Sequence, residues 1–124
     1  MNQLIAIAAG GALGAVSRYL VASGVHNLLG RGFPYGTLSV NIIGSLLMGF
    51  LYIVLIERLG VESYWRALVL VGFLGAFTTF STFSMETLNL IENGEHIKAM
   101  LNMLLSVTTC LIACWLGLIA GRQL

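Results

Sequence analysis

Four long runs without charged residues constrain the fold of this chain more than any other feature. No Asp, Glu, Lys or Arg occurs in residues 1–17, 32–56, 67–85 and 99–121. Each run approaches the roughly 20 residues that an α-helix needs to cross a hydrocarbon core about 30 Å thick. Only 9% of the 124 residues are charged, whereas soluble domains average about 25%. The sequence therefore predicts a membrane protein.

The four runs predict an all-α protein with a single four-helix transmembrane domain over residues 1–124. The expected helices, joined by short segments, cover residues 3–27, 36–57, 64–91 and 97–121. A cleaved signal peptide at the start is disfavoured, because the first run lacks a basic n-region and continues through Arg18-Tyr19-Leu20 without a convincing cleavage site.

The basic residues give no preferred orientation in the membrane. Four helices place both termini on one side. The six basic residues then divide equally, with Arg58, Arg66 and Arg122 on the side of the termini and Arg18, Arg31 and Lys98 on the other. The positive-inside rule is therefore balanced. Either a feature other than charge sets the orientation, or copies insert both ways and two opposed copies pair about a two-fold axis in the membrane plane.

The third run is interrupted by an unusual polar stretch. Residues 75–87 read GAFTTFSTFSMET and contain five hydroxyl residues between Thr78 and Ser84. Glycine weakens a helix, and Ser and Thr side chains compete for its backbone hydrogen bonds. The stretch therefore predicts a helix break in the third span. A membrane tolerates such a break only against protein or a water-filled cavity.

A broken helix has electrostatic consequences. The first half ends in free carbonyls, the second begins with free N–H groups, and transporters hold ions at such points. Carbonyls between Gly75 and Thr78 suit a hard cation, which two copies meeting at the break could share. The donors that follow suit an anion.

Aromatic and amide side chains are candidate partners for that anion. Phe80 and Phe83 lie three residues apart and share a helix face. They either pack in the core or turn the positive edges of their rings towards an anion. Asn41 offers two N–H donors, for a contact between helices or for an ion. On the fourth span, Ser106 belongs to a polar stripe with Asn102 and Thr109.

Two charged residues, Glu86 and Arg18, are further candidates for a functional role. Glu86 follows the hydroxyl cluster, and a carboxylate within a membrane is a functional candidate, although this one can also lie close to the interface. Arg18, near the predicted end of the first span, either snorkels towards water or lines a positive vestibule.

Catalytic and metal chemistry find little support in the sequence. We see no nucleophile–base pair and no cluster of metal ligands, so we expect no enzyme. Cys110 and Cys114 lie four apart on the last span, and two thiols alone make a poor zinc site. The glycines of residues 10–14 lack the Lys-Ser/Thr of a phosphate-binding loop.

Four segments resemble the Fluc family of fluoride channels, also called CrcB. These are GGALGAVSRY (residues 10–19), GTLSVNIIGSLLMG (36–49), GFLGAFTTFSTFSMET (72–87) and NMLLS (102–106). The resemblance extends over essentially the whole chain, and the motif of the third span is its most specific part. Ala76 is the one small departure, where many members have a second glycine.

The resemblance implies an antiparallel, dual-topology homodimer in a bacterial inner membrane, with two pores for passive fluoride export that lowers fluoride toxicity. It implies a structural sodium ion at the dimer centre, held by backbone carbonyls of Gly75 and Thr78 from both copies. The expected partners are fluoride, a second copy and the lipid bilayer, with no nucleic acid. The residues that it assigns along or beside the fluoride path are Phe80, Phe83, Asn41, Ser81, Thr82, Thr37, Ser106 and Glu86.

Three other functions are also compatible with parts of the sequence. A small proton-coupled multidrug exporter has a similar size, but it needs a carboxylate in its first helix, and the first span here has no Asp or Glu. A non-transporting subunit of a larger complex would leave the hydroxyl cluster without a use. Proton-coupled fluoride transport would use Glu86 as the proton carrier.

Overall fold

The computed structural model describes residues 2–124, and they form four long helices that are apolar enough to cross a membrane. The helices run over Asn2–Leu29, Tyr35–Arg58, Ser63–Glu92 and His96–Gln123. Their ends lie within one or two residues of the ranges expected from the uncharged runs. The described part of the chain is therefore all-helical, as the sequence predicts.

Two of the four helices are composite. The first is α1 (Asn2–Leu29), and the fourth is α6 (His96–Gln123). The second consists of α2 (Tyr35–Tyr52) followed by the π-helical η1 (Ile53–Arg58). The third consists of α3 (Ser63–Arg66), the π-helical η2 (Ala67–Leu74), α4 (Gly75–Phe77) and α5 (Phe80–Glu92).

Glycines close the three turns between these helices. Gly30, Gly60 and Gly94 have φ angles of 87°, 59° and 79°. Residues with a Cβ rarely adopt this left-handed conformation, so glycine commonly ends a helix in this way. The turns are short, and neighbouring helices therefore run antiparallel.

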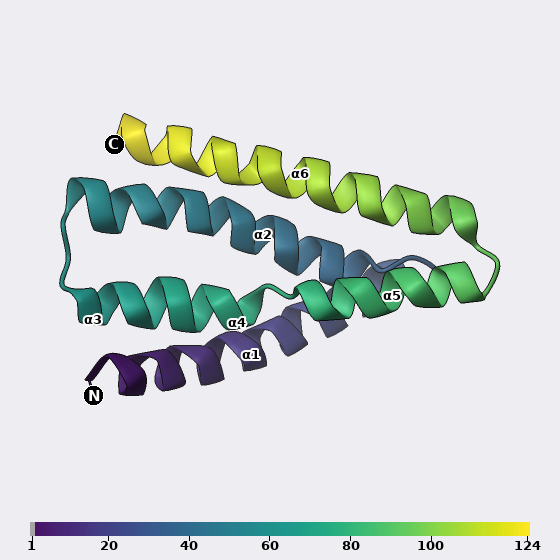
Figure 1. Cartoon of the computed structure of the whole chain (residues 1–124), viewed down its shortest axis with the longest axis horizontal. Helices are drawn as coiled ribbons and strands as arrows, with labels where there is room; N and C mark the ends of the chain where they lie inside the picture. Colours follow the sequence, from purple (N-terminus) through teal and green to yellow (C-terminus); the bar gives the residue numbers. More distant parts are fainter. Residues whose placement is uncertain (1) are drawn as a thin grey trace.

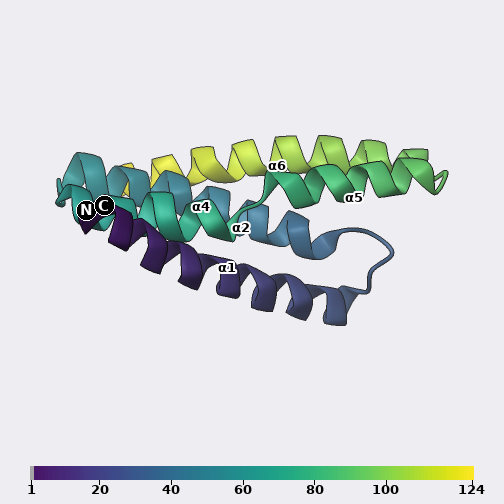
Figure 2. The same cartoon turned by 60° about the horizontal axis from the view of Figure 1, so that its bottom comes forward.

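The bundle places both chain ends together. Figure 1 shows the N- and C-termini at the same end of the bundle, with the N-terminus beside α3. A thin connecting segment joins α4 to α5 about half-way along the bundle (Figure 1). In Figure 2, α1 diverges from α5 and α6 towards the end opposite the termini.

Close contacts between helices depend on glycines. Gly10 and Gly14 of α1 face the backbone of Leu68 and Phe73 in η2 so closely that a Cβ at either glycine would overlap it. These small residues therefore pack within one copy of the chain. Helix packing through small residues is the usual solution where lipid provides no hydrophobic driving force.

The structure places Arg18 well inside the first helix, since α1 covers Asn2–Leu29, and not near the helix end. The charge ends the first uncharged run but does not end the helix. There the Nε of Arg18 donates a hydrogen bond of 3.0 Å to the Ala76 carbonyl. Because Arg18 lies within the span, it is not counted among the basic residues at either end of the bundle. The two ends then differ by one basic residue. Arg58, Arg66 and Arg122 lie at the termini, and Arg31 and Lys98 at the other end.

Candidate functional site

The polar stretch of the third helix contains a change of backbone conformation. Between α4 and α5, Thr78 (φ −89°, ψ 158°) and Thr79 (φ −150°, ψ 123°) are extended. Branching at Cβ makes threonine well suited to extended backbone. The Thr79 hydroxyl then caps α5 by accepting the amide of Thr82 at 3.2 Å, as threonine often does at the start of a helix.

Asn41 of α2 pairs both polar backbone groups of Thr79. The Thr79 amide donates to Oδ1 of Asn41 at 2.8 Å, and Nδ2 of Asn41 donates to the Thr79 carbonyl at 3.0 Å. In a continuous helix the Thr79 amide would instead reach the Gly75 carbonyl. Asn41 therefore takes the place of the helical bond that the Thr79 amide lacks, and the Gly75 carbonyl is left without that partner.

Four residues assigned to the fluoride path meet in one groove between α2, α5 and α6. The groove has a volume of about 260 Å³, and its lining comprises Asn41, Phe80, Phe83, Ser106, Val107, Cys110 and Leu111. The ring centroids of Phe80 and Phe83 are 5.4 Å apart with the planes tilted by 41°. Phe80 is 77% exposed in the single chain, so it does little to fill the protomer core.

A second hollow lies on the other side of the extended segment. It has a volume of about 200 Å³ and is lined by Arg18, Thr37 and Thr82, together with His26 and Thr79 among others. Thr37 is buried at 5% exposure. This hollow combines hydroxyl groups with the guanidinium of Arg18, so its polar lining is electropositive.

Ser81 lies apart from these two hollows. Its side chain is exposed and sits 3.4 Å from the Thr79 hydroxyl, with either oxygen able to donate. The structure thus keeps Ser81 within the cluster of hydroxyls at the start of α5, while Thr82 alone of the two lines a hollow.

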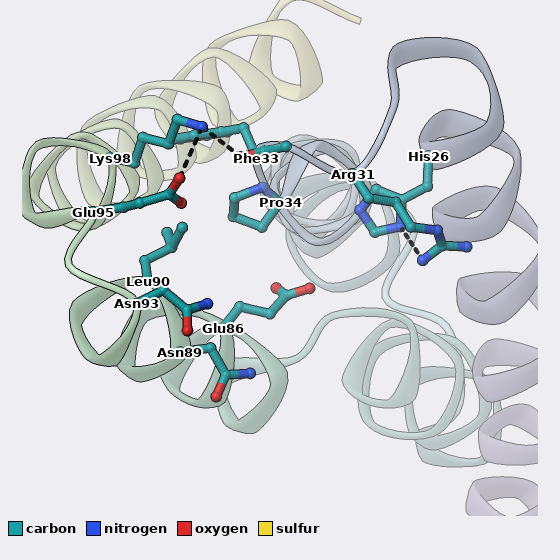
Figure 3. A pocket seen from close by; sticks show the side chains of 11 residues that line it. His26, Arg31, Phe33, Pro34, Glu86, Asn89, Leu90, Asn93, Glu95 and Lys98 are labelled. Carbon is teal, nitrogen blue, oxygen red and sulfur yellow. Dashed lines mark hydrogen bonds and ion pairs between the residues drawn. The ribbon is translucent and has the colours of Figure 1, made fainter.

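Glu86 lies in a third cavity at the end of the bundle opposite the termini. This cavity of about 350 Å³ lies between α5, the start of α6 and the loop after α1. Figure 3 shows the carboxylate of Glu86 pointing towards Pro34. Its Oε1 atom is buried and has no hydrogen-bond partner among the described residues. Glu86 is therefore separated from the groove that holds Phe80 and Phe83.

The basic groups around this cavity already have partners. Nζ of Lys98 lies 3.5 Å from Oε1 of Glu95 and donates to the Gly32 carbonyl at 3.1 Å. Nε2 of His26 accepts the Gly36 amide at 3.0 Å, at the start of α2. Figure 3 shows Lys98 with Glu95 on one side and Arg31 with His26 on the other.

The sequence does not predict the places of two residues at the interruption and the groove. In the sequence Thr79 is one hydroxyl of a cluster, whereas in the structure its backbone pairs with Asn41. Cys110 lies one helical turn after Ser106 and lines the same groove. The spacing of four residues along α6 was the available signal for Cys110.

One of the two carbonyls expected to hold sodium, that of Gly75, lacks its usual helical partner. Among residues 2–124, no group of three or more His, Cys, Asp or Glu side chains could hold a metal. The expected donors are instead backbone carbonyls. The Gly75 carbonyl loses its usual helical partner to Asn41, and Gly75 itself is exposed on the surface of the protomer. Free carbonyl oxygens are suitable ligands for a hard cation such as sodium.

Comparison with known proteins decides the family. A family model described as "CrcB-like protein, Camphor Resistance (CrcB)" matches residues 5–118. The chain belongs to the CrcB family. A relative from Magnetococcus marinus is 55% identical over 97% of this chain and 98% of its own length. One from Coxiella burnetii is 54% identical over the full length of both chains.

A third relative of this CrcB chain comes from Methylococcus capsulatus. It is 56% identical over 98% of this chain, which spans only about half, 54%, of that protein. All three relatives carry the name "Fluoride-specific ion channel FluC", so they are named as channels and not as enzymes. Family and helices together make this CrcB chain a multi-pass inner-membrane protein.

Proposed function

We propose that this CrcB chain is a passive, fluoride-selective channel that exports cytoplasmic fluoride. One observation carries the proposal: the rings of Phe80 and Phe83, the amide of Asn41 and the hydroxyl of Ser106 share one groove beside the extended segment. Fluoride holds its water tightly, so a dry path must replace that shell with donors and positive ring edges. The names of the close relatives support fluoride as the ion.

The proposed active form is an antiparallel homodimer of two copies inserted in opposite directions, with the interruption of the third helix inside the membrane. The two ends of the bundle differ by only one basic residue, which gives the positive-inside rule little to act on. Exposure of Gly75 and Phe80 on one protomer supports a second copy near the interruption. Each copy would then contribute one path.

Sodium is proposed as a structural ion at the centre of this dimer. The carbonyls of Gly75 and Thr78 from both copies would hold it. A bound cation would supply positive charge that offsets the carbonyl ends of the two α4 segments.

Export follows from the chemistry of hydrogen fluoride. The neutral acid enters from acidic surroundings and dissociates in the cytoplasm, and a negative interior potential drives the anion out. No second substrate is needed for this direction of flow. The polar residues around the groove are neutral, which suits passage of an ion better than tight binding.

The test is efflux from liposomes that contain only this protein. With fluoride inside and a potassium ionophore to dissipate charge, fluoride should leave while chloride in matched vesicles stays. Equal efflux of both ions would contradict selectivity. With hydrogen fluoride leakage controlled, an imposed pH gradient should not concentrate fluoride; if it did, proton-coupled transport through Glu86 would replace the channel proposal.

A further inference from the structure

Three buried polar side chains connect α5 to α6 behind the groove. Thr87, Asn102 and Ser106 are 6%, 2% and 8% exposed. The Thr87 hydroxyl donates to the Phe83 carbonyl at 2.8 Å, Nδ2 of Asn102 donates to the Thr87 hydroxyl oxygen at 2.9 Å, and the Ser106 hydroxyl lies 3.4 Å from Oδ1 of Asn102. These hydrogen bonds connect Ser106, which lines the groove, to the backbone carbonyl of Phe83.

The direction of these hydrogen bonds is determined. Thr87 has a single O–H, which is used on the Phe83 carbonyl, so its oxygen can only accept from Asn102. The NH₂ of Asn102 must therefore face Thr87. Its Oδ1 must face Ser106, where it can only accept.

Ser106 differs in its acceptor from four other hydroxyls of the third and fourth helices and the interruption between α4 and α5. Hydroxyls of Thr78, Ser84, Thr87 and Thr109 each donate to the backbone carbonyl four residues earlier. This is the common choice for Ser and Thr within helices. Ser106 instead donates to the side chain of the residue four positions earlier. Because Asn102 accepts this hydrogen bond, the Ser106 hydroxyl does not donate to the backbone carbonyl.

We infer that Asn102 is a positioning residue for the ion path, acting through Ser106; this inference rests on the proposed function. At 3.4 Å the bond from Ser106 to Asn102 is long and weak, so the hydroxyl turns easily from Oδ1 to an anion in the groove. Without Oδ1, the proton would settle on the backbone carbonyl of residue 102, a shorter bond that it would leave less readily. The groove would then lose a donor.

A double-mutant cycle in the liposome efflux assay tests this inference. Asn102→Leu has a similar shape, and it orphans no donor because Thr87 keeps its own bond to Phe83. Asn102→Leu and Ser106→Ala should each slow fluoride efflux roughly two- to tenfold, the effect of one hydrogen bond. The double variant should be no slower than Ser106→Ala alone. Thr109→Val, which removes a hydroxyl from the same helix outside the groove, should conduct like the wild type.

The outcomes separate this inference from the proposed function. If Asn102 only supports the fold, the two effects should multiply in the double variant, and the inference is then wrong. Wild-type speed in Ser106→Ala also overturns it, while fluoride efflux by the unmodified protein keeps the proposed function. No fluoride efflux by the unmodified protein would overturn both. If Asn102→Leu does not fold by size-exclusion chromatography, Asn102→Ala takes its place in the cycle.

Discussion

At the scale of single residues, the two rings of the groove differ from ordinary core aromatics. Phe80 is largely exposed in the protomer, and its ring meets that of Phe83 at a tilt. By contrast, Phe73 and Phe77, in the half of the same helix before the interruption, stack nearly parallel with an angle of 9°. Phe80 and Phe83, unlike Phe73 and Phe77, line the groove that also holds Asn41 and Ser106, where the positive ring edges can face an anion.

Replacing either groove ring by an aliphatic side chain should stop conduction without unfolding the protein. Phe80→Ile and Phe83→Ile keep apolar bulk, with a packing cost of about 1–2 kcal/mol, but remove the positive ring edge. Fluoride efflux per folded dimer should fall by orders of magnitude, because an aliphatic wall cannot replace lost hydration. Phe73→Ile is the control and should conduct normally. Normal fluoride efflux through both well-folded groove variants would show that the rings of Phe80 and Phe83 serve only in packing.

At the scale of helices, backbone contacts through glycine set the distance between α2 and α6. Gly49 of α2 faces the backbone of Cys114, and Gly117 of α6 faces the backbone of Leu46, each too closely for a Cβ. Because the obstacle is backbone, no side-chain rotation can relieve it. These contacts hold Asn41 on α2 and Ser106 on α6 against the same groove.

Adding one methyl group at these contacts should separate the helices. Gly49→Ala and Gly117→Ala should each destabilise the protein by about 1–3 kcal/mol through overpacking. Gly24→Ala is the matched control, since a Cβ there meets nothing within 4 Å, and alanine should stabilise that helix by up to about 1 kcal/mol. Thermal unfolding in detergent, followed by size-exclusion chromatography, measures the difference. Equal midpoints for Gly49→Ala and Gly24→Ala would refute the argument.

At the scale of the whole molecule, weak charge bias predicts two orientations in one membrane. A tag at the C-terminus should be accessible from both faces of the membrane. Two or three added Lys at one end should bias insertion and reduce fluoride efflux, and a second copy biased the opposite way should restore it. A tag of the unmodified protein found on one face only would contradict dual topology.

The sequence predicts helix positions better than it predicts contacts. A bilayer demands long uncharged runs, so the helix ends could be placed within one or two residues. The pairing of Asn41 with Thr79 joins residues 38 apart in the chain, and no periodicity announces it. The charge of Arg18 suggests a helix end, whereas in the structure its Nε donates to the Ala76 carbonyl inside the bundle. The sequence identifies Cys110 only as half of a poor metal site, and the groove that it lines becomes evident only in the structure.

The contacts around Thr78 and Thr79 also bear on how the molecule moves. Alternating-access carriers move one bundle against another and need a hinge that changes its backbone angles freely. Here the interruption is fastened on two sides, to α1 through Arg18 and to α2 through both polar groups of Asn41. Rocking the two halves of the third helix would break all of these bonds in every transport cycle. On the proposed channel function, these bonds keep the interrupted third helix fixed while fluoride passes beside it.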